Sequence, residues 1–315
     1  MKPKSLLLAV AGCLSLSACA VSVSTDDGIA ARSAEAAFNA ESAAAQLAPD
    51  AARYSTQTFD WLDGPRQRSV PARLYLPVAS REASARPVPL VVFSHGIGGS
   101  RDGYKYLGRY LAANGYACLH VQHVGSDRQL WFGNPLGLFG RLSDAARESE
   151  AIDRVRDLSF ALDQLLAGDV GARVDRQRII VAGHSYGANT SMLAAGAQVE
   201  RDGRLLRLRD DRIKAAILMS APPFYGSTDT GRILSGITIP TLHITATEDD
   251  ITIPGYRSGL TDRLDVYQAI GNGQAAPKAL AVFKGGSHSI FTDRMGTGGM
   301  ELNPKVKAAT RDLAV

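Results

Sequence analysis

The sequence predicts an α/β fold with a mostly parallel central sheet, an antiparallel N-terminal start and helices on both faces. From about residue 54, short apolar segments alternate with segments of helical periodicity. The later apolar segments are hydrophobic along their whole length, as parallel strands covered on both faces usually are. The first two instead flank a Gly-Pro turn, which indicates an antiparallel pair. We therefore expect one domain over residues 54–315.

The first twenty residues are expected to lie outside this domain. The segment MKPKSLLLAVAGCLSLSACA has two lysines, an apolar run from Leu6 to Ala18 and then a cysteine. This pattern is typical of an export signal, and the run is too short for a spanning helix. Its end, LSAC, resembles the bacterial lipobox, which implies a signal peptide over residues 1–19 and a lipid anchor at Cys19 in the bacterial cell envelope. Ala20 after the cysteine favours the outer membrane. Lipidation at Cys13, or cleavage after Ala20 without a lipid, are the alternatives.

Residues 20–53 are predicted to form a flexible tether. They are rich in Ala, Ser, Asp and Glu and poor in large apolar side chains, so they cannot bury a core of their own. One weak Ala-rich helix is expected around residues 33–47.

Within the domain, the first two strands are expected over 56–63 and 70–78, and the third over 88–96. A helix over 102–115 ends at a glycine, and a strand follows over 116–123. A long amphipathic helix is expected over 143–168, capped by Ser143 or Asp144. The chain then continues with a strand over 178–183, a helix over 186–198 and strands over 213–222, 239–249 and 278–288.

The segment 124–142 breaks this alternation. It carries Trp131, Phe132 and Phe139 among glycines, so it is expected to leave the sheet edge. Two interpretations stay open, a lid and a surface loop held in place by its own aromatic side chains.

Composition restricts the function classes. With 45% hydrophobic and 21% charged residues, the 315-residue chain is expected to be globular with a sizeable core. Its net charge of +4 is scattered, without a Lys/Arg run that could follow phosphates, so nucleic acid is not an expected partner. After export, Cys118 is the one cysteine left beyond the signal region and is expected to be a buried small hydrophobe.

The segment VAGHSYGANTS carries the first chemical signal. Gly183 and Gly187 lie two positions to either side of Ser185, between an expected strand and an expected helix. Such small residues let the two backbones approach closely, so that a sharp turn lifts the serine hydroxyl above the strand ends. The same turn places the Tyr186 N–H where an oxyanion would develop. We interpret Ser185 as a nucleophile; the alternative is an ordinary serine in a tight turn.

A nucleophilic serine needs a base, and His288 is the candidate. It follows the last expected strand on a glycine-flanked loop, at the strand end where reactive groups gather in α/β sheets. The other histidines lie in or at the ends of expected strands, or beside the serine in the case of His184. His120 and His123 have the spacing of a metal pair, but on a strand they would face opposite ways, so no metal is expected.

The base in turn needs a buried carboxylate, and three acids end the penultimate strand, Glu248, Asp249 and Asp250. Counting residues forward from Ala246 and Thr247 selects Asp249 as this acid, and we prefer it. Counting residues back from Pro254 selects Asp250 instead.

A second oxyanion donor is expected from the loop FSHGIGGSRDGY, where the backbone N–H of Ile97 is the candidate. The glycines of this loop lack both the Walker lysine and the spacing of a dinucleotide fingerprint, so no cofactor is expected.

Taken together, the loop at 93–104 and the segments VAGHSYGANTS, LHITATEDD and GGSHSIF resemble the α/β-hydrolase superfamily over most of residues 70–295. More narrowly, they are similar to the dienelactone-hydrolase-like and platelet-activating-factor-acetylhydrolase-like esterases. The resemblance implies the α/β-hydrolase fold and a serine carboxylic-ester hydrolase that works through an acyl-enzyme. It implies the roles of nucleophile, base, acid and two amide donors for Ser185, His288, Asp249, Ile97 and Tyr186.

Two departures from the family pattern stand out. Dienelactone hydrolases use a cysteine nucleophile, so Ser185 favours esters of a more ordinary kind. The chain ends at KVKAATRDLAV within an expected helix, which is shorter than members of the family usually have. The expected partners are a small-molecule or lipid ester and, through Cys19, a membrane. The alternative functions are a non-catalytic binding or scaffold lipoprotein of the same fold and a serine peptidase, which is disfavoured because no gating domain is present.

Overall fold

The computed structural model describes residues 21–25, 51–81, 86–201, 203–224, 229–253, 256–271, 277–293 and 302–315. The expected signal and its cysteines lie outside these residues, as does the helix expected around 33–47. In the described part of the chain, no helix has the length and apolarity needed to cross a membrane.

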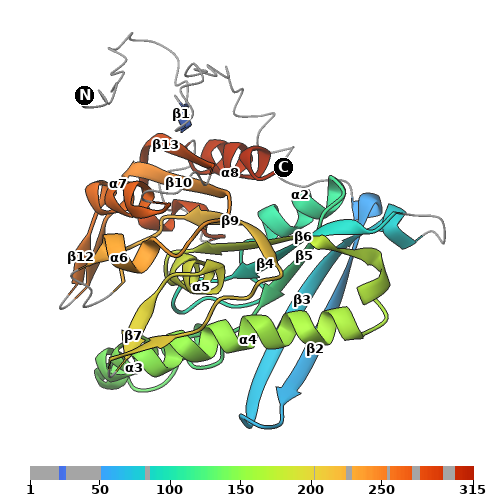
Figure 1. Cartoon of the computed structure of the whole chain (residues 1–315), viewed down its shortest axis with the longest axis horizontal. Helices are drawn as coiled ribbons and strands as arrows, with labels where there is room; N and C mark the ends of the chain where they lie inside the picture. Colours follow the sequence, from blue (N-terminus) through green and yellow to red (C-terminus); the bar gives the residue numbers. More distant parts are fainter. Residues whose placement is uncertain are drawn as a thin grey trace.

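A nine-stranded sheet forms the centre of the structure (Figure 1), in the order β1-β13-β10-β9-β6-β4-β5-β3-β2. The six strands from β13 to β5 run parallel, and β3 and β2 continue the sheet antiparallel at one edge. This confirms the predicted parallel sheet and its antiparallel start. The strands are β1 (Val21–Thr25), β2 (Tyr54–Asp63), β3 (Arg68–Pro77), β4 (Val88–Ser94), β5 (Ala117–Val121), β6 (Val174–His184), β9 (Ile213–Met219), β10 (Thr241–Glu248) and β13 (Lys278–Ser287).

Helices cover both faces of the sheet, because alternate residues of each buried strand point to opposite sides. The helices among the described residues are α2 (Lys105–Ala113), α3 (Leu138–Ala145), α4 (Glu148–Ala167), α5 (Tyr186–Ala195), α6 (Thr230–Leu234), α7 (Leu260–Ala269) and α8 (Leu302–Leu313). Leu90 and Val92 of β4 pack with α4 and α5, whereas Val91 and Phe93 pack with α2 and α8. The described residues also form two short hairpins, β7 (Val199–Arg201) with β8 (Arg204–Leu206) and β11 (Ile251–Ile253) with β12 (Tyr256–Ser258).

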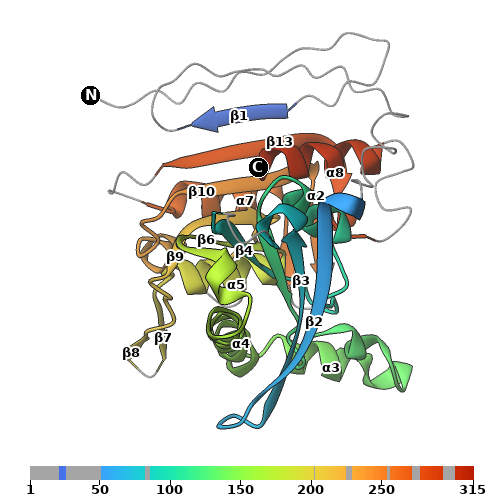
Figure 2. The same ribbon diagram turned by 90° about the vertical axis from the view of Figure 1, so that its right-hand side faces the viewer.

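The edge strand β1 lies within the segment that was expected to be a tether. It pairs antiparallel with β13, from Val21 opposite Phe283 to Thr25 opposite Ala279, and Figure 2 shows it alongside β13 at the sheet edge. The tether interpretation is therefore wrong for residues 21–25. Their sequence VSVST has β-branched residues at alternate positions, and the open edge of β13 offers them unpaired backbone groups.

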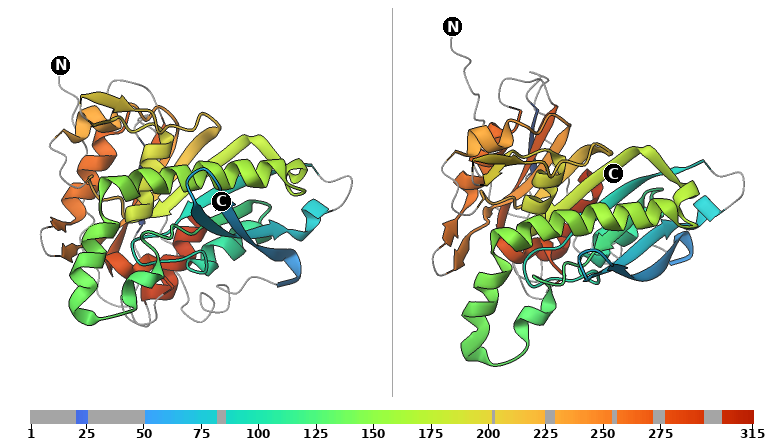
Figure 3. Two further views of the ribbon diagram at one scale, coloured as in Figure 1. Left: turned by 90° about the horizontal axis from the view of Figure 1, so that it is seen from below. Right: turned by 60° about the horizontal axis from the view of Figure 1, so that its bottom comes forward.

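The helix expected over 143–168 is two helices. Ser143 and Asp144 belong to α3, and α4 begins at Glu148 after the extended residue Arg147, without a side-chain cap. The predicted cap is thus wrong, because the apolar periodicity continues across the break and does not record a change of axis. Figure 3 shows α3 turning away from α4. The carboxylates of Glu148 and Glu150 in the first turn of α4 complement the positive end of its dipole.

Candidate active site

Ser185 lies on a sharp turn between β6 and α5. Its backbone has φ 58° and ψ −123°, a strained conformation for a residue with a side chain, and its N–H donates to the carbonyl of Met219. A Cβ on Gly183 would lie 2.1 Å from the Gly187 carbonyl oxygen, and a Cβ on Gly187 would lie 1.9 Å from that of Ser94. Only glycine fits at both positions, and the close approach lifts Ser185 to the carboxyl end of the sheet.

His288 is brought to this serine by the turn after β13. Its Nε2 lies 2.7 Å from the Ser185 Oγ, and its Nδ1 lies 2.7 Å from the Asp249 Oδ1. Since an ionised carboxylate can only accept, Nδ1 carries the proton and Nε2 is free to accept from the serine hydroxyl. Gly285 and Gly286, with φ of 74° and 92°, allow the chain to turn back toward the serine.

Asp249 is the carboxylate that faces His288. Its side chain is fully buried and also accepts a 2.7 Å hydrogen bond from the Thr245 hydroxyl. Burial alone would raise the pKa of this carboxyl. The hydrogen bond and charge of His288, together with the charge of Arg263 at 3.5 Å, instead hold the pKa well below its usual range. Asp249 is therefore a carboxylate at neutral pH.

The neighbouring acids point elsewhere. Asp250 is exposed, and its Oδ1 lies against Gly259, 2.6 Å from where a Cβ would stand. Glu248, the last residue of β10, is exposed as well. Of the two aspartates between which the sequence left a choice, Asp249 is the one that the structure brings to His288.

The two backbone amides expected to form the oxyanion site belong to Ile97 and Tyr186. A Cβ on Gly96 would stand 3.4 Å from the Ser185 Cβ, so the loop after β4 is in contact with the turn. The next residue, Ile97, donates its N–H to no backbone acceptor in the described part of the chain. The Tyr186 N–H is the first of α5, where helix geometry supplies no acceptor. The loop that carries Ile97 is thus in contact with the turn that carries Ser185 and Tyr186.

His184 is a functional candidate that the sequence did not single out. Its Nε2 lies 2.9 Å from the carbonyl oxygen of His288, and its Nδ1 lies 2.8 Å from the Tyr104 hydroxyl. Burial lowers the pKa of His184 to about 3. His184 is the middle residue of the Gly-x-Ser motif. The motif predicts where this residue lies in the turn but not that its side chain contacts the His288 carbonyl.

The spaced histidines of β5 and its following loop do not form a metal site. The His120 Nδ1 lies 3.0 Å from the Gly103 carbonyl oxygen on one face, whereas the His123 Nδ1 faces Asp157 on the other. Within the described residues, no three His, Cys, Asp or Glu side chains gather as metal ligands. Cys118 is fully buried, and burial raises the pKa of its thiol.

Comparison with known proteins bears on the family and the fold. A model of the alpha/beta hydrolase family matches residues 91–268. A platelet-activating factor acetylhydrolase from Cavia porcellus is 27% identical over 151 residues, which are 38% of this chain and 34% of the relative. The match thus spans about a third of the length of that relative.

Solved structures share the fold. A ferulic acid esterase from Streptomyces cinnamoneus superposes with a TM-score of 0.62 at 24% identity, over 85% of this chain and 89% of that protein. A cold-adapted esterase from an Arctic intertidal metagenomic library gives a TM-score of 0.55 at 19% identity, over 83% and 93% of the two chains. At these identities the likeness concerns the fold alone.

Proposed function

The chain belongs to the alpha/beta hydrolase family, and we propose that it is a serine carboxylic-ester hydrolase. One observation carries the proposal, the unbroken hydrogen-bonded series from Asp249 through His288 to Ser185, with 2.7 Å at each step. This is the arrangement in which a serine hydroxyl can lose its proton as it attacks a carbonyl carbon. The sequence relative named as a platelet-activating factor acetylhydrolase favours an ester as the substrate.

The proposed reaction has two halves. Ser185 Oγ attacks the ester carbonyl carbon while His288 Nε2 takes its proton, and the Asp249 carboxylate stabilises the imidazolium that forms. The N–H groups of Ile97 and Tyr186 donate to the oxyanion of the tetrahedral intermediate. His288 then gives the proton to the leaving alkoxide, which leaves an acyl-enzyme on Ser185. A water molecule attacks the acyl carbon while His288 takes its proton. As the second tetrahedral intermediate collapses, its bond to the Ser185 Oγ breaks, His288 returns the proton to that oxygen, and the acid is released.

Covalent labelling with a fluorophosphonate tests the nucleophile. The wild-type chain is expected to take up one phosphonyl group per molecule, and Ser185→Ala none. Turnover of p-nitrophenyl acetate should fall at least ~10⁴-fold in that variant. Ser159→Ala is a matched control, because this serine lies on α4 and its hydroxyl bonds Asp210. Absence of labelling in the wild type, together with no hydrolysis of short p-nitrophenyl esters, would favour the non-catalytic lipoprotein instead.

A chain-length series of p-nitrophenyl esters defines the substrate class. Preference for acyl groups of about two to four carbons would place the activity with acetylesterases, and preference for eight or more with lipases. The matching p-nitroanilides test the peptidase alternative, and turnover of anilides at the rate of the esters would contradict the ester assignment.

Anchorage in the cell envelope through Cys19 is a second part of the proposal. It is supported by the export pattern of residues 1–20 and by the LSAC sequence that ends in Cys19. Radiolabelled palmitate should be incorporated into the wild-type chain and the Cys13→Ser variant but not into Cys19→Ser. Loss of palmitate incorporation in Cys13→Ser, with incorporation retained in Cys19→Ser, would show that the lipid is attached at Cys13.

A further inference from the structure

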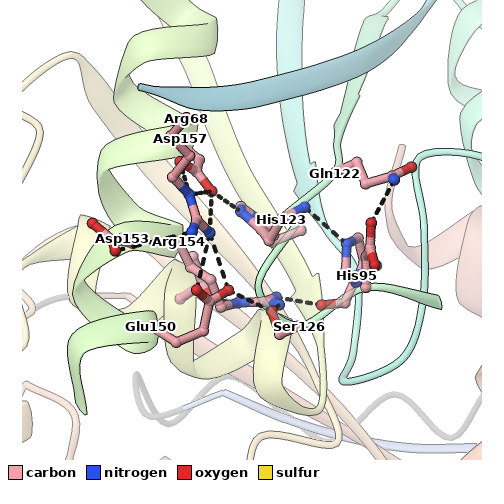
Figure 4. A network of polar contacts seen from close by, with 12 residues as sticks. Arg68, His95, Gln122, His123, Ser126, Glu150, Asp153, Arg154 and Asp157 are labelled. Atoms are coloured by element: carbon pink, nitrogen blue, oxygen red, sulfur yellow. Dashed lines mark hydrogen bonds and ion pairs between the residues drawn. The ribbon is translucent and has the colours of Figure 1, made fainter. Parts of the chain in front are cut away.

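Arg154 is a fully buried arginine at the centre of a polar network between α4 and the loops beside Ser185 (Figure 4). Its guanidinium donates three hydrogen bonds, to the His95 carbonyl at 2.5 Å, the Ser126 hydroxyl at 2.7 Å and the Thr190 hydroxyl at 2.8 Å. The carbon of the guanidinium also lies 4.4 Å from the centre of the Tyr186 ring. One side chain therefore contacts both segments that carry the proposed oxyanion amides.

The first contact holds the loop that contains Ile97. Arg154 binds the carbonyl of His95, two residues before Ile97, and Ser126 accepts the N–H of Gly98, the residue after it, at 2.8 Å. The Ser126 hydroxyl is itself an acceptor for Arg154. The loop is thus tied to the same guanidinium on both sides of Ile97, once directly and once through Ser126.

The second contact holds the first turn of α5. The Thr190 hydroxyl accepts from the Arg154 Nε and donates to the Tyr186 carbonyl at 3.1 Å. The positive guanidinium also lies over the face of the Tyr186 ring, an attractive arrangement. Both contacts restrain the residue whose N–H is the second proposed donor.

Burying this cation is costly for the fold. Burial lowers the pKa of Arg154, although a guanidinium stays charged at neutral pH. Within the described residues no carboxylate forms an ion pair with it. The Glu150 carboxylate is reached through Ser126, whose hydroxyl donates to it at 2.8 Å, and Asp157 pairs with Arg68 instead. An unpaired buried charge is hard to explain by stability alone, because a well-packed apolar side chain is often at least as stabilising.

We infer that Arg154 is a positioning residue for the oxyanion site, which fixes the Ile97 and Tyr186 amides relative to one another. This inference rests on the proposed hydrolase function. A planar fork of donors can hold two backbone segments at a set spacing, whereas a single ammonium cannot reach all the acceptors at once. Amides placed in this way lower the energy of the transition state more than that of the bound ester.

Substitution of Arg154 by lysine keeps the positive charge but replaces the planar guanidinium, with its several N–H donors, by a single ammonium group. We expect kcat for p-nitrophenyl acetate to fall ten- to a hundredfold in Arg154→Lys, with KM within about threefold of wild type. Affinity for a trifluoromethyl ketone, which forms a tetrahedral adduct with an active serine, should fall by about the same factor as kcat. Rates are counted per serine labelled to completion with fluorophosphonate, so that unfolded protein does not contribute.

Two further variants separate positioning from stability. Thr190→Val removes both hydrogen bonds of the Thr190 hydroxyl, from the Arg154 Nε and to the Tyr186 carbonyl, and keeps the other contacts of Arg154. It should lower kcat and ketone affinity by a smaller, matching factor. Arg311→Lys, at another buried arginine that stacks on Tyr110 of α2, should lower the melting temperature without changing kcat.

Wild-type kcat and ketone affinity per labelled serine in both Arg154→Lys and Thr190→Val would overturn the inference, as would a loss of kcat without a loss of ketone affinity. Retained turnover in Ser185→Ala would instead refute the proposed function itself.

Discussion

The His184 Nε2 lies 2.9 Å from the carbonyl oxygen of His288. His184, the residue before Ser185, therefore holds the backbone of His288, whose ring faces Ser185. Because a carbonyl can only accept, Nε2 carries the proton, and Nδ1 accepts from the Tyr104 hydroxyl. The two histidine rings lie 4.8 Å apart. Burial lowers the pKa of His184 to about 3, so this neutral tautomer persists at neutral pH.

Replacement of His184 should therefore reduce catalysis without removing any group of the proposed mechanism. We expect kcat to fall about tenfold in His184→Leu, because the His288 backbone loses a buried donor worth ~1–3 kcal/mol. His184→Gln, whose amide can still donate, should recover part of the loss. Steady-state kinetics on p-nitrophenyl acetate check this, and equal rates in wild type and His184→Leu would show that the contact does not orient the base.

The two neighbouring aspartates provide a matched pair of variants. Asp249→Asn should lower kcat about 10³- to 10⁴-fold, because the neutral amide neither fixes the His288 tautomer nor stabilises its cation. Asp250→Asn, at an exposed position, should change kcat less than about twofold. Fluorophosphonate labelling rates give a second measure of both effects. The opposite ranking of the two variants would mean that Asp250 is the acid.

Gly187 should not tolerate a side chain. The Cβ of Gly187→Ala would lie 1.9 Å from the Ser94 carbonyl oxygen, which is backbone and cannot move aside cheaply. We expect a loss of ~3 kcal/mol or more in the free energy of unfolding, together with loss of labelling at Ser185. Gly64→Ala is the control, since no atom lies within 4 Å of its Cβ position. Urea unfolding measures both, and similar stabilities would contradict the close approach of β4 and α5.

Stability should fall as the pH drops below about 6.5. Burial lowers the pKa of five histidines, namely His95, His120, His123, His184 and His243. Between the unfolded pKa near 6.5 and these lower values, the unfolded chain binds more protons, so the free energy of unfolding decreases with decreasing pH. Each group contributes up to ~1.4 kcal/mol per pH unit over that interval.

His243 allows a direct measurement of one such contribution. Its Nε2 is buried without a hydrogen-bond partner among the described residues, and burial lowers its pKa to about 3. His243→Leu should reduce the slope of unfolding free energy against pH by up to ~1.4 kcal/mol per unit between pH 6 and 5. Urea titrations at pH 7.5, 6.0 and 5.0 supply the slopes. An unchanged slope would mean that His243 takes up no proton on unfolding.

Local sequence patterns were sufficient to predict the parts of the structure that depend on residues close together in the chain. The strand-turn-helix around Ser185 follows from small residues at fixed offsets, and the parallel sheet follows from apolar segments that alternate with helical ones. The position of His288 after the last strand was also readable, because parallel strands end at a common edge. The N-terminal cap of α4 could not be predicted in this way. The hydrophobic periodicity continues through residues 146–147, where the structure has a break between α3 and α4.

The sequence by itself thus determined the fold class, the turn that presents Ser185 and the strand ends at which its partners stand. Only the tertiary structure decided which of two adjacent aspartates faces His288, that His184 holds the His288 carbonyl, and that Arg154 joins the two amide-bearing segments. In the sequence Arg154 is one more charged residue on an amphipathic helix. Its burial and its partners, His95 and Thr190, depend on how α4 packs against β4 and α5, and such long-range packing leaves no periodic signal in the chain.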